Sequence, residues 1–147
     1  MKSLTFALLL ALAATLPAAA GTLRLTGNKS VTVEVTLADS VVSPGATIDL
    51  AMKFTPVEGI HINLQPPLDF KADTASQVPL SGGLVLPKGS PYLNTSAPVV
   101  QRFTIPKDAK PGRLTLKGTL VYFYCSDKDG WCSKYKQAVE LSLTVRR

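Results

Sequence analysis

The sequence predicts an all-β protein, because apolar and polar residues alternate with a period of two in many segments of the chain. After residue 20, no segment sustains the roughly 3.6-residue periodicity of an amphipathic helix. Combinations of proline, glycine and serine that favour turns separate the alternating segments. Together these observations favour an immunoglobulin-like antiparallel β-sandwich of about seven strands.

The expected strands differ in which positions are apolar. In residues 31–37 the odd-numbered positions are apolar, and in residues 47–54 the even-numbered positions are. In residues 113–124 the apolar positions are again even, and Gly118 among them predicts a β-bulge or a close approach by another stretch of backbone. The expected strands are residues 22–25, 31–37, 47–54, 59–64, 99–105, 113–124 and 138–145.

Residues 1–20 are predicted to be a signal peptide. Lys2 precedes an uncharged apolar run, and Ala18-Ala19-Ala20 supply a small-residue cleavage site. The apolar run is shorter than the roughly 20 residues that a membrane-spanning helix needs. We therefore expect an exported, soluble protein that is not embedded in the membrane, in which residues 21–147 form a single monomeric domain.

The charge of the chain is mildly positive. The formal net charge is +6, and loss of Lys2 with the signal peptide lowers it to about +5. The cations are spread singly from Arg24 to Arg147, without the basic stripe that is typical of nucleic-acid-binding surfaces. Nucleic acid is therefore not an expected partner.

The least regular part of the chain is residues 69–97, which are rich in proline, glycine and serine. A connection of this length between strands is uncommon unless it has a function. Long loops on rigid β-scaffolds often carry binding residues, so this segment is a candidate lid or binding loop.

Cys125 and Cys132, the two cysteines of the chain, flank a predicted hairpin loop. Asp129-Gly130 suits such a turn, because glycine tolerates a positive φ angle and aspartate can bond to nearby backbone. Exported proteins ordinarily pair their cysteines, and two cysteines allow one intrachain pairing. Position and compartment leave two roles open, a structural disulfide that staples the hairpin or a disulfide that exchanges with other thiols.

Other kinds of site are not favoured by the sequence. Two cysteines and His61 cannot complete a tetrahedral zinc site without carboxylates, so neither a metal nor another cofactor is expected. No esterase, zinc-protease or phosphate-loop motif is present, which disfavours a hydrolase. By alternation, His61 and Asn63 point away from the core, either as an exposed polar pair or with His61 as a proton acceptor near the cysteines.

The same alternation predicts which way the residues before the hairpin point. Tyr122 and Tyr124 continue the inward positions of the strand, whereas Phe123 and Cys125 face the other side. Cys125 is therefore expected to be accessible, as thiol exchange requires, and to be the cysteine that becomes linked to a partner.

Several motifs occur in an order that is similar to one family. The most distinctive are Leu120-Val-Tyr-Phe-Tyr-Cys125 and Gly130-Trp-Cys132, which look like a Tyr-x-x-Cys and Gly-aromatic-Cys signature. With the motifs that precede them, they make the mature chain resemble the N-terminal periplasmic domain of DsbD-type thiol:disulfide interchange proteins. The preceding motifs are Ser43-Pro-Gly45, Glu58-Gly-Ile-His-Ile-Asn63, Leu86-Pro-Lys-Gly89 and Arg102-Phe-Thr-Ile-Pro106.

The resemblance implies an immunoglobulin-like domain with a reversible disulfide under a cap loop that carries an aromatic residue. By motif, Cys125 and Cys132 would be the redox pair, Tyr122 a supporting aromatic and Tyr92 the cap aromatic. A membrane thiol reductase would act in trans, and electrons would be relayed between it and periplasmic thioredoxin-fold proteins, as in a protein-disulfide reductase. No acidic residue lies between Asp73 and Asp108, so the cap would lack a carboxylate to assist the thiols.

The alternative is a non-enzymatic exported β-sandwich that binds a partner and carries a structural hairpin disulfide.

Overall fold

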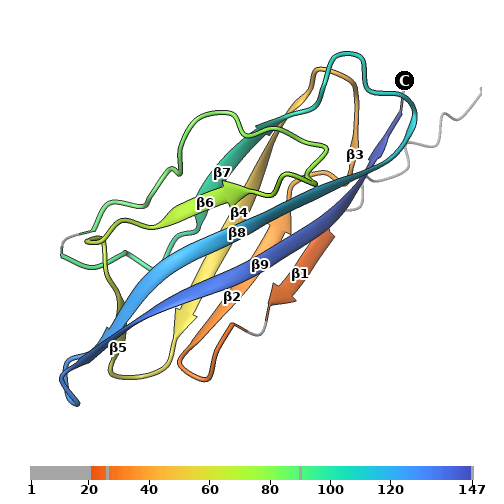
Figure 1. Ribbon diagram of the computed structural model, residues 1–147. Coiled ribbons are helices and arrows are strands. Elements are labelled where there is room, and N and C mark those ends of the chain that lie inside the picture. Colours follow the sequence, from red (N-terminus) through yellow and green to blue (C-terminus); the bar gives the residue numbers. More distant parts are fainter. Residues whose placement is uncertain (1–20, 26, 90, 147) are drawn as a thin grey trace, which may run out of the picture.

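The computed structural model describes residues 21–25, 27–89 and 91–146, so the predicted signal peptide lies outside the described residues. In the described part, the strands form two sheets packed face to face (Figure 1). The first sheet has the order β1-β2-β4-β7, and the second has the order β3-β9-β8-β5 with β6 also paired to β8. The first comprises β1 (Gly21–Leu25), β2 (Val31–Leu37), β4 (Thr47–Pro56) and β7 (Val99–Thr104). The second comprises β3 (Val41–Val42), β5 (Ile60–Ile62), β6 (Asp69–Ala72), β8 (Gly112–Ser126) and β9 (Trp131–Val145).

The predicted all-β sandwich is confirmed, with two corrections. The described residues hold nine strands and not about seven. The two additional strands, β3 and β6, are too short to show a clear alternation in the sequence. In addition, β3 runs parallel to β9, so the second sheet is not purely antiparallel. Among the described residues, no helix has the length and apolar character needed to span a membrane.

The alternating apolar residues of the two sheets form one core between them. The odd positions of β2 and the even positions of β4 are buried, as the sequence predicts. From the second sheet, the even positions of β8 face the same core, and the ring of Tyr122 meets the edge of Phe54 with their centroids 5.3 Å apart. Each such large apolar side chain contributes about 1.5–3 kcal/mol when it is fully buried.

Gly118 marks a close approach and not a bulge: the backbone of β6 approaches it, with Lys71 O 2.9 Å from where a Cβ atom would lie, but a side-chain ring of β6 comes closer still. The pairing of β8 with β9 continues without a break from Gly112 to Ser126. A Cβ atom on Gly118 would lie 2.4 Å from Cε1 and 2.5 Å from Cζ of Phe70, a ring on β6. Glycine therefore makes room for the packing of β6 against the long hairpin of β8 and β9.

The segment between β6 and β7 is anchored to both sheets. Leu80 and Val85 form isolated bridges to β7 in the first sheet. Tyr92 forms a bridge to Asn63, which directly follows β5 in the second sheet. The segment that the sequence suggests as a lid therefore carries Tyr92 to the end of the sandwich where β5 meets the β8–β9 hairpin.

Candidate functional site: a disulfide pocket

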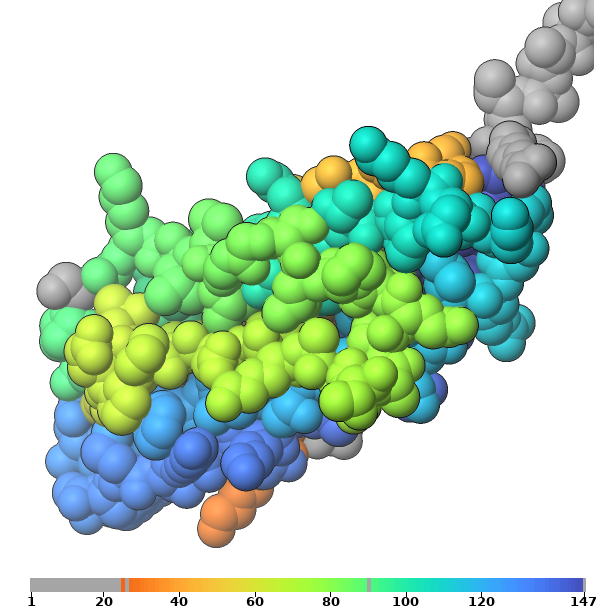
Figure 2. All heavy atoms as spheres, turned by 45° about the horizontal axis from the view of Figure 1, so that its top comes forward, coloured from red at the N-terminus to blue at the C-terminus, as the bar shows by residue number. Residues whose placement is uncertain are grey.

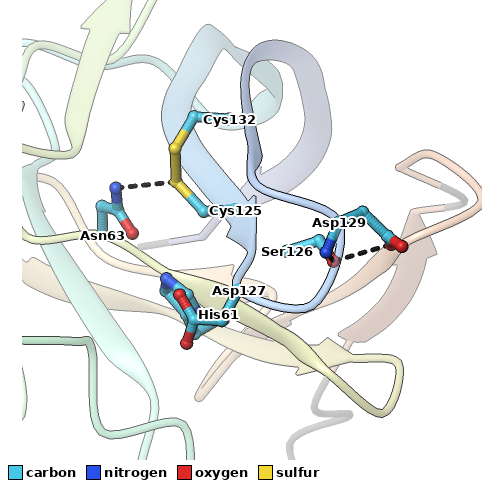
Figure 3. Close-up of a disulfide and its surroundings, with 7 residues drawn as sticks. All are labelled: His61, Asn63, Cys125, Ser126, Asp127, Asp129 and Cys132. Atoms are coloured by element: carbon cyan, nitrogen blue, oxygen red, sulfur yellow. Dashed lines mark hydrogen bonds and ion pairs between the residues drawn. A yellow bond between two sulfur atoms is a disulfide. The ribbon is translucent and has the colours of Figure 1, made fainter.

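Cys125 and Cys132 lie directly opposite each other on β8 and β9 and are joined by a disulfide (Figure 3). Their Cα atoms are 4.1 Å apart, and the S–S bond is 1.99 Å long. The predicted pairing is confirmed, but the loop is shorter than predicted, because both strands continue past the cysteines. At the turn, Gly130 has a φ of 67°, and Ser126 Oγ donates to Asp129 Oδ2 at 2.8 Å.

The two sulfur-bearing residues differ in exposure. Cys125 is only 5% exposed, whereas Cys132 is exposed to solvent. The prediction that Cys125 is accessible is therefore wrong. Alternation assigns Cys125 to the outer side of the sheet, but at this point other side chains cover that side. These side chains come from the end of β5 and from the segment around Tyr92.

Asn63 directs its amide group at the buried sulfur. Its Nδ2 donates to Cys125 Sγ at 3.0 Å (Figure 3), and its backbone N–H donates to the carbonyl of Phe123 at 2.9 Å. The Oδ1 atom of Asn63 is buried and has no hydrogen-bond partner among the described residues. A donor held this way would stabilise a thiolate at Cys125, because a hydrogen bond to the charged form favours that form. The sequence gives only a weak signal for this role, namely that Asn63 shares a face with His61.

His61 lies beside the disulfide and is not the exposed polar residue that simple alternation suggests. It is the direct partner of Cys125 in the pairing of β5 with β8, and its side chain is only 16% exposed. Its ring stacks on Tyr92 with centroids 3.6 Å apart, and its Nδ1 lies 3.3 Å from Asp127 Oδ2. The hairpin turn thus places the carboxylate of Asp127 beside His61.

Aromatic side chains border the pocket on two sides. Tyr92, the predicted cap residue, is 39% exposed and lines the pocket together with both cysteines. Trp131 is 38% exposed, and its ring meets that of Tyr124 edge-on with centroids 5.7 Å apart. The pocket has a volume of about 360 Å³, and Cys132 is the solvent-exposed one of the two cysteines that line it.

Tyr122, the predicted supporting aromatic, lies in the core and not in this pocket. It is fully buried, and its hydroxyl accepts a hydrogen bond from Asn28 Nδ2 at 3.2 Å. Burial, and to a smaller extent the neighbouring Tyr135 and Tyr124, raise the pKa of Tyr122, while the Asn28 hydrogen bond lowers it in part. Tyr122 therefore supports the packing under the hairpin without facing the disulfide.

Among the described residues, no group of three or more histidine, cysteine or acidic side chains is placed to hold a metal ion. Comparison of the chain with protein-family models, with curated proteins and with solved structures found no match. A functional conclusion therefore depends on the chemistry of the disulfide pocket itself.

Proposed function

We propose that this domain is a periplasmic thiol:disulfide exchange module of the DsbD N-terminal type. It would relay electrons, through Cys125 and Cys132, between a membrane thiol reductase and thioredoxin-fold proteins. The observation that carries the proposal is the asymmetry of the disulfide. One sulfur belongs to an exposed residue, and the other belongs to a buried residue that accepts a hydrogen bond from Asn63.

This asymmetry suits a stepwise exchange. A partner thiolate attacks Cys132 Sγ, a new S–S bond forms to the partner, and the bond to Cys125 breaks. Cys125 Sγ leaves with the electron pair as a thiolate, which Asn63 Nδ2 stabilises. A second thiolate of the partner then attacks the partner's own sulfur and releases Cys132 as a thiolate. The partner is oxidised by two electrons, the domain is reduced by two, and the released thiolates take up protons from water.

The cover over Cys125 makes the exchange selective for one sulfur. Attack on a disulfide needs open space along the extension of the S–S bond. Asn63, His61 and Tyr92 occupy the surroundings of Cys125, and Cys132 is the more open residue. Mixed disulfides are therefore expected at Cys132, whereas the sequence alone favours Cys125.

Trapping of mixed disulfides tests this proposal with two matched variants. Cys125→Ser removes the thiol that would release a partner bonded to Cys132. The Cys132 thiolate of this variant should attack the disulfide of an oxidised thioredoxin-fold protein, whose other sulfur leaves as a thiolate, and the mixed disulfide should accumulate. Cys132→Ser leaves only the buried thiol and should accumulate little. If neither variant is trapped while both keep the circular dichroism of the parent, exchange is ruled out and the disulfide is a structural staple.

The reduction potential separates the same two functions in the unmodified protein. An exchange disulfide is expected at about −180 to −230 mV, in the range of known exchange proteins. A structural disulfide is expected below about −300 mV. A value in the lower range would favour the binding-module alternative.

A further inference from the structure

A groove runs along the outer face of the second sheet, and its lining reaches Phe123, two residues before Cys125 on the same strand. Its floor is formed by Thr119, Val121 and Phe123 of β8, and its volume is about 550 Å³. Lys71 of β6 borders it on one side together with the carboxylates of Asp69 and Asp73, and Lys134 and Lys136 of β9 border it on the other. Figure 2 shows the yellow and lime spheres of the segment around β6 next to the blue spheres of the hairpin.

The groove and the exposed cysteine share the same two strands. Three consecutive outward pairs of β8 and β9 are Cys125 with Cys132, Phe123 with Lys134, and Val121 with Lys136. Alternate residues of a strand point to the same side and are about 7 Å apart. We call these three pairs the outer ladder. A partner bonded to Cys132 would therefore lie within reach of both lysines.

The two lysines of the outer ladder are not neutralised. Among the described residues, no carboxylate lies within ion-pair distance of Lys134 or Lys136. Other lysines on the same sheet are paired, Lys71 with Asp69 at 3.5 Å and Lys117 with Glu140 at 3.2 Å. Lys134 lies over the ring of Phe123, with Nζ 5.5 Å from the ring centroid. The ladder thus presents two free positive charges above an apolar floor.

We propose that the outer ladder is a docking surface for an acidic segment that flanks the reactive cysteine of the partner. The inference rests on the exchange function proposed above and adds the chemical class of the partner surface. Aspartate or glutamate side chains of that segment pair with Lys134 and Lys136 while its cysteine sulfur reaches Cys132. Such complementarity raises the rate of productive encounter more than it raises affinity, and salt weakens it.

Peptide thiols test the inference directly. Three peptides of equal length carry one cysteine flanked by glutamates, by serines or by lysines. Each is used to reduce the disulfide of the full domain, and each rate constant is divided by the measured thiolate fraction of that peptide. At low ionic strength, the glutamate peptide is expected to react about tenfold faster than the serine peptide, and the lysine peptide more slowly. The difference should shrink as salt is added.

Variants assign the charge preference to the outer ladder. Lys134→Gln combined with Lys136→Gln should remove the preference for the glutamate peptide. The control variant combines Lys107→Gln with Lys110→Gln and removes the same amount of positive charge. These two lysines precede Gly112, the first residue of β8, and so lie near the end of that strand that is far from Cys125. This variant should keep the preference for the glutamate peptide.

The outcomes separate the two proposals. If the three peptides react at equal corrected rates, or if the preference survives in the Lys134 and Lys136 variant, the docking surface is ruled out while exchange stands. If no peptide reduces the disulfide, the exchange function and the docking surface both fail.

Discussion

Replacing Asn63 by leucine tests whether its amide serves the leaving sulfur. The change removes the Nδ2 donor that lies 3.0 Å from Cys125 Sγ, but keeps a side chain of nearly the same size over that sulfur. The size matters, because a smaller residue would uncover Cys125 and change its rate of attack for a different reason. The fold should tolerate the change, since leucine also removes the buried Oδ1 atom that has no hydrogen-bond partner among the described residues.

The size of the effect follows from the charge on the acceptor. A hydrogen bond to a charged group contributes about 1.5–3 kcal/mol, so the thiolate at Cys125 should lose a factor of roughly 10 to 100 in relative stability. In the transition state only part of the negative charge has reached the leaving sulfur. We take a Brønsted coefficient of about 0.4–0.5 as the fraction of the thiolate stabilisation that already acts there. Reduction should therefore be about threefold to tenfold slower in Asn63→Leu.

The assay is reduction by dithiothreitol at fixed pH, followed by the fluorescence of Trp131, the single tryptophan, which directly precedes Cys132. Asn63→Asp keeps the shape, lacks the donor and adds a like charge, so it should be slower still. An unchanged rate in a folded Asn63→Leu protein would refute the role of the amide. A faster rate would refute it as well, because leucine keeps the cover over Cys125 and removes only the amide.

Three further predictions concern packing, pH and the cover. Gly118→Ala should lower the free energy of unfolding by about 1–3 kcal/mol, because its Cβ would overlap the buried ring on β6. Gly83→Ala meets nothing within 4 Å and is the control, so equal midpoints in urea would contradict the close packing. Burial raises the pKa of Tyr122, so above about pH 10 this hydroxyl ionises in the unfolded chain but not in the folded protein. The free energy of unfolding should therefore hold its full value below about pH 10 and fall as pH rises above it. Tyr122→Phe should flatten this decline in urea titrations at several alkaline pH values, and an identical decline in both proteins would exclude Tyr122 as its source. Tyr92→Ala should speed the reduction of the Cys125–Cys132 disulfide severalfold, because a thinner cover opens Cys125 Sγ to attack in addition to Cys132 Sγ, and an unchanged rate would place the cover elsewhere.

Local alternation predicts much of this fold, because burial on one side of a strand imposes a period of two. The inward positions of β2, β4 and β8 and the pairing of Cys125 with Cys132 all follow from residues close together in the sequence. The sequence does not predict the short strand β6, because Pro66 and Pro67 precede it and its four residues are too few to show an alternation of apolar and polar positions.

The cover over the disulfide is less accessible to sequence reasoning. Alternation states which side of a sheet a residue faces, but not which distant segment lies on that side. Cys125 is covered by Asn63 and Tyr92, which come from two segments that precede it by more than thirty residues. Their meeting depends on the bridge between Asn63 and Tyr92, a single backbone pairing outside any regular strand. The exposure of the two cysteines could therefore not be assigned from the hairpin alone.

The backbone beside Tyr92 is tied down although its ring is 39% exposed. The next residue, Leu93, is buried, and its N–H donates to the carbonyl of Ile62 at 2.9 Å. Moving the Tyr92 ring off the pocket therefore needs rotation of one side chain and no displacement of the loop. Exposed side chains change rotamer in picoseconds to nanoseconds, far faster than proteins meet. Rotation of the Tyr92 ring is thus a rapid pre-equilibrium that precedes entry of a thiol into the pocket, so the rate of reduction should rise in proportion to thiol concentration without reaching a plateau.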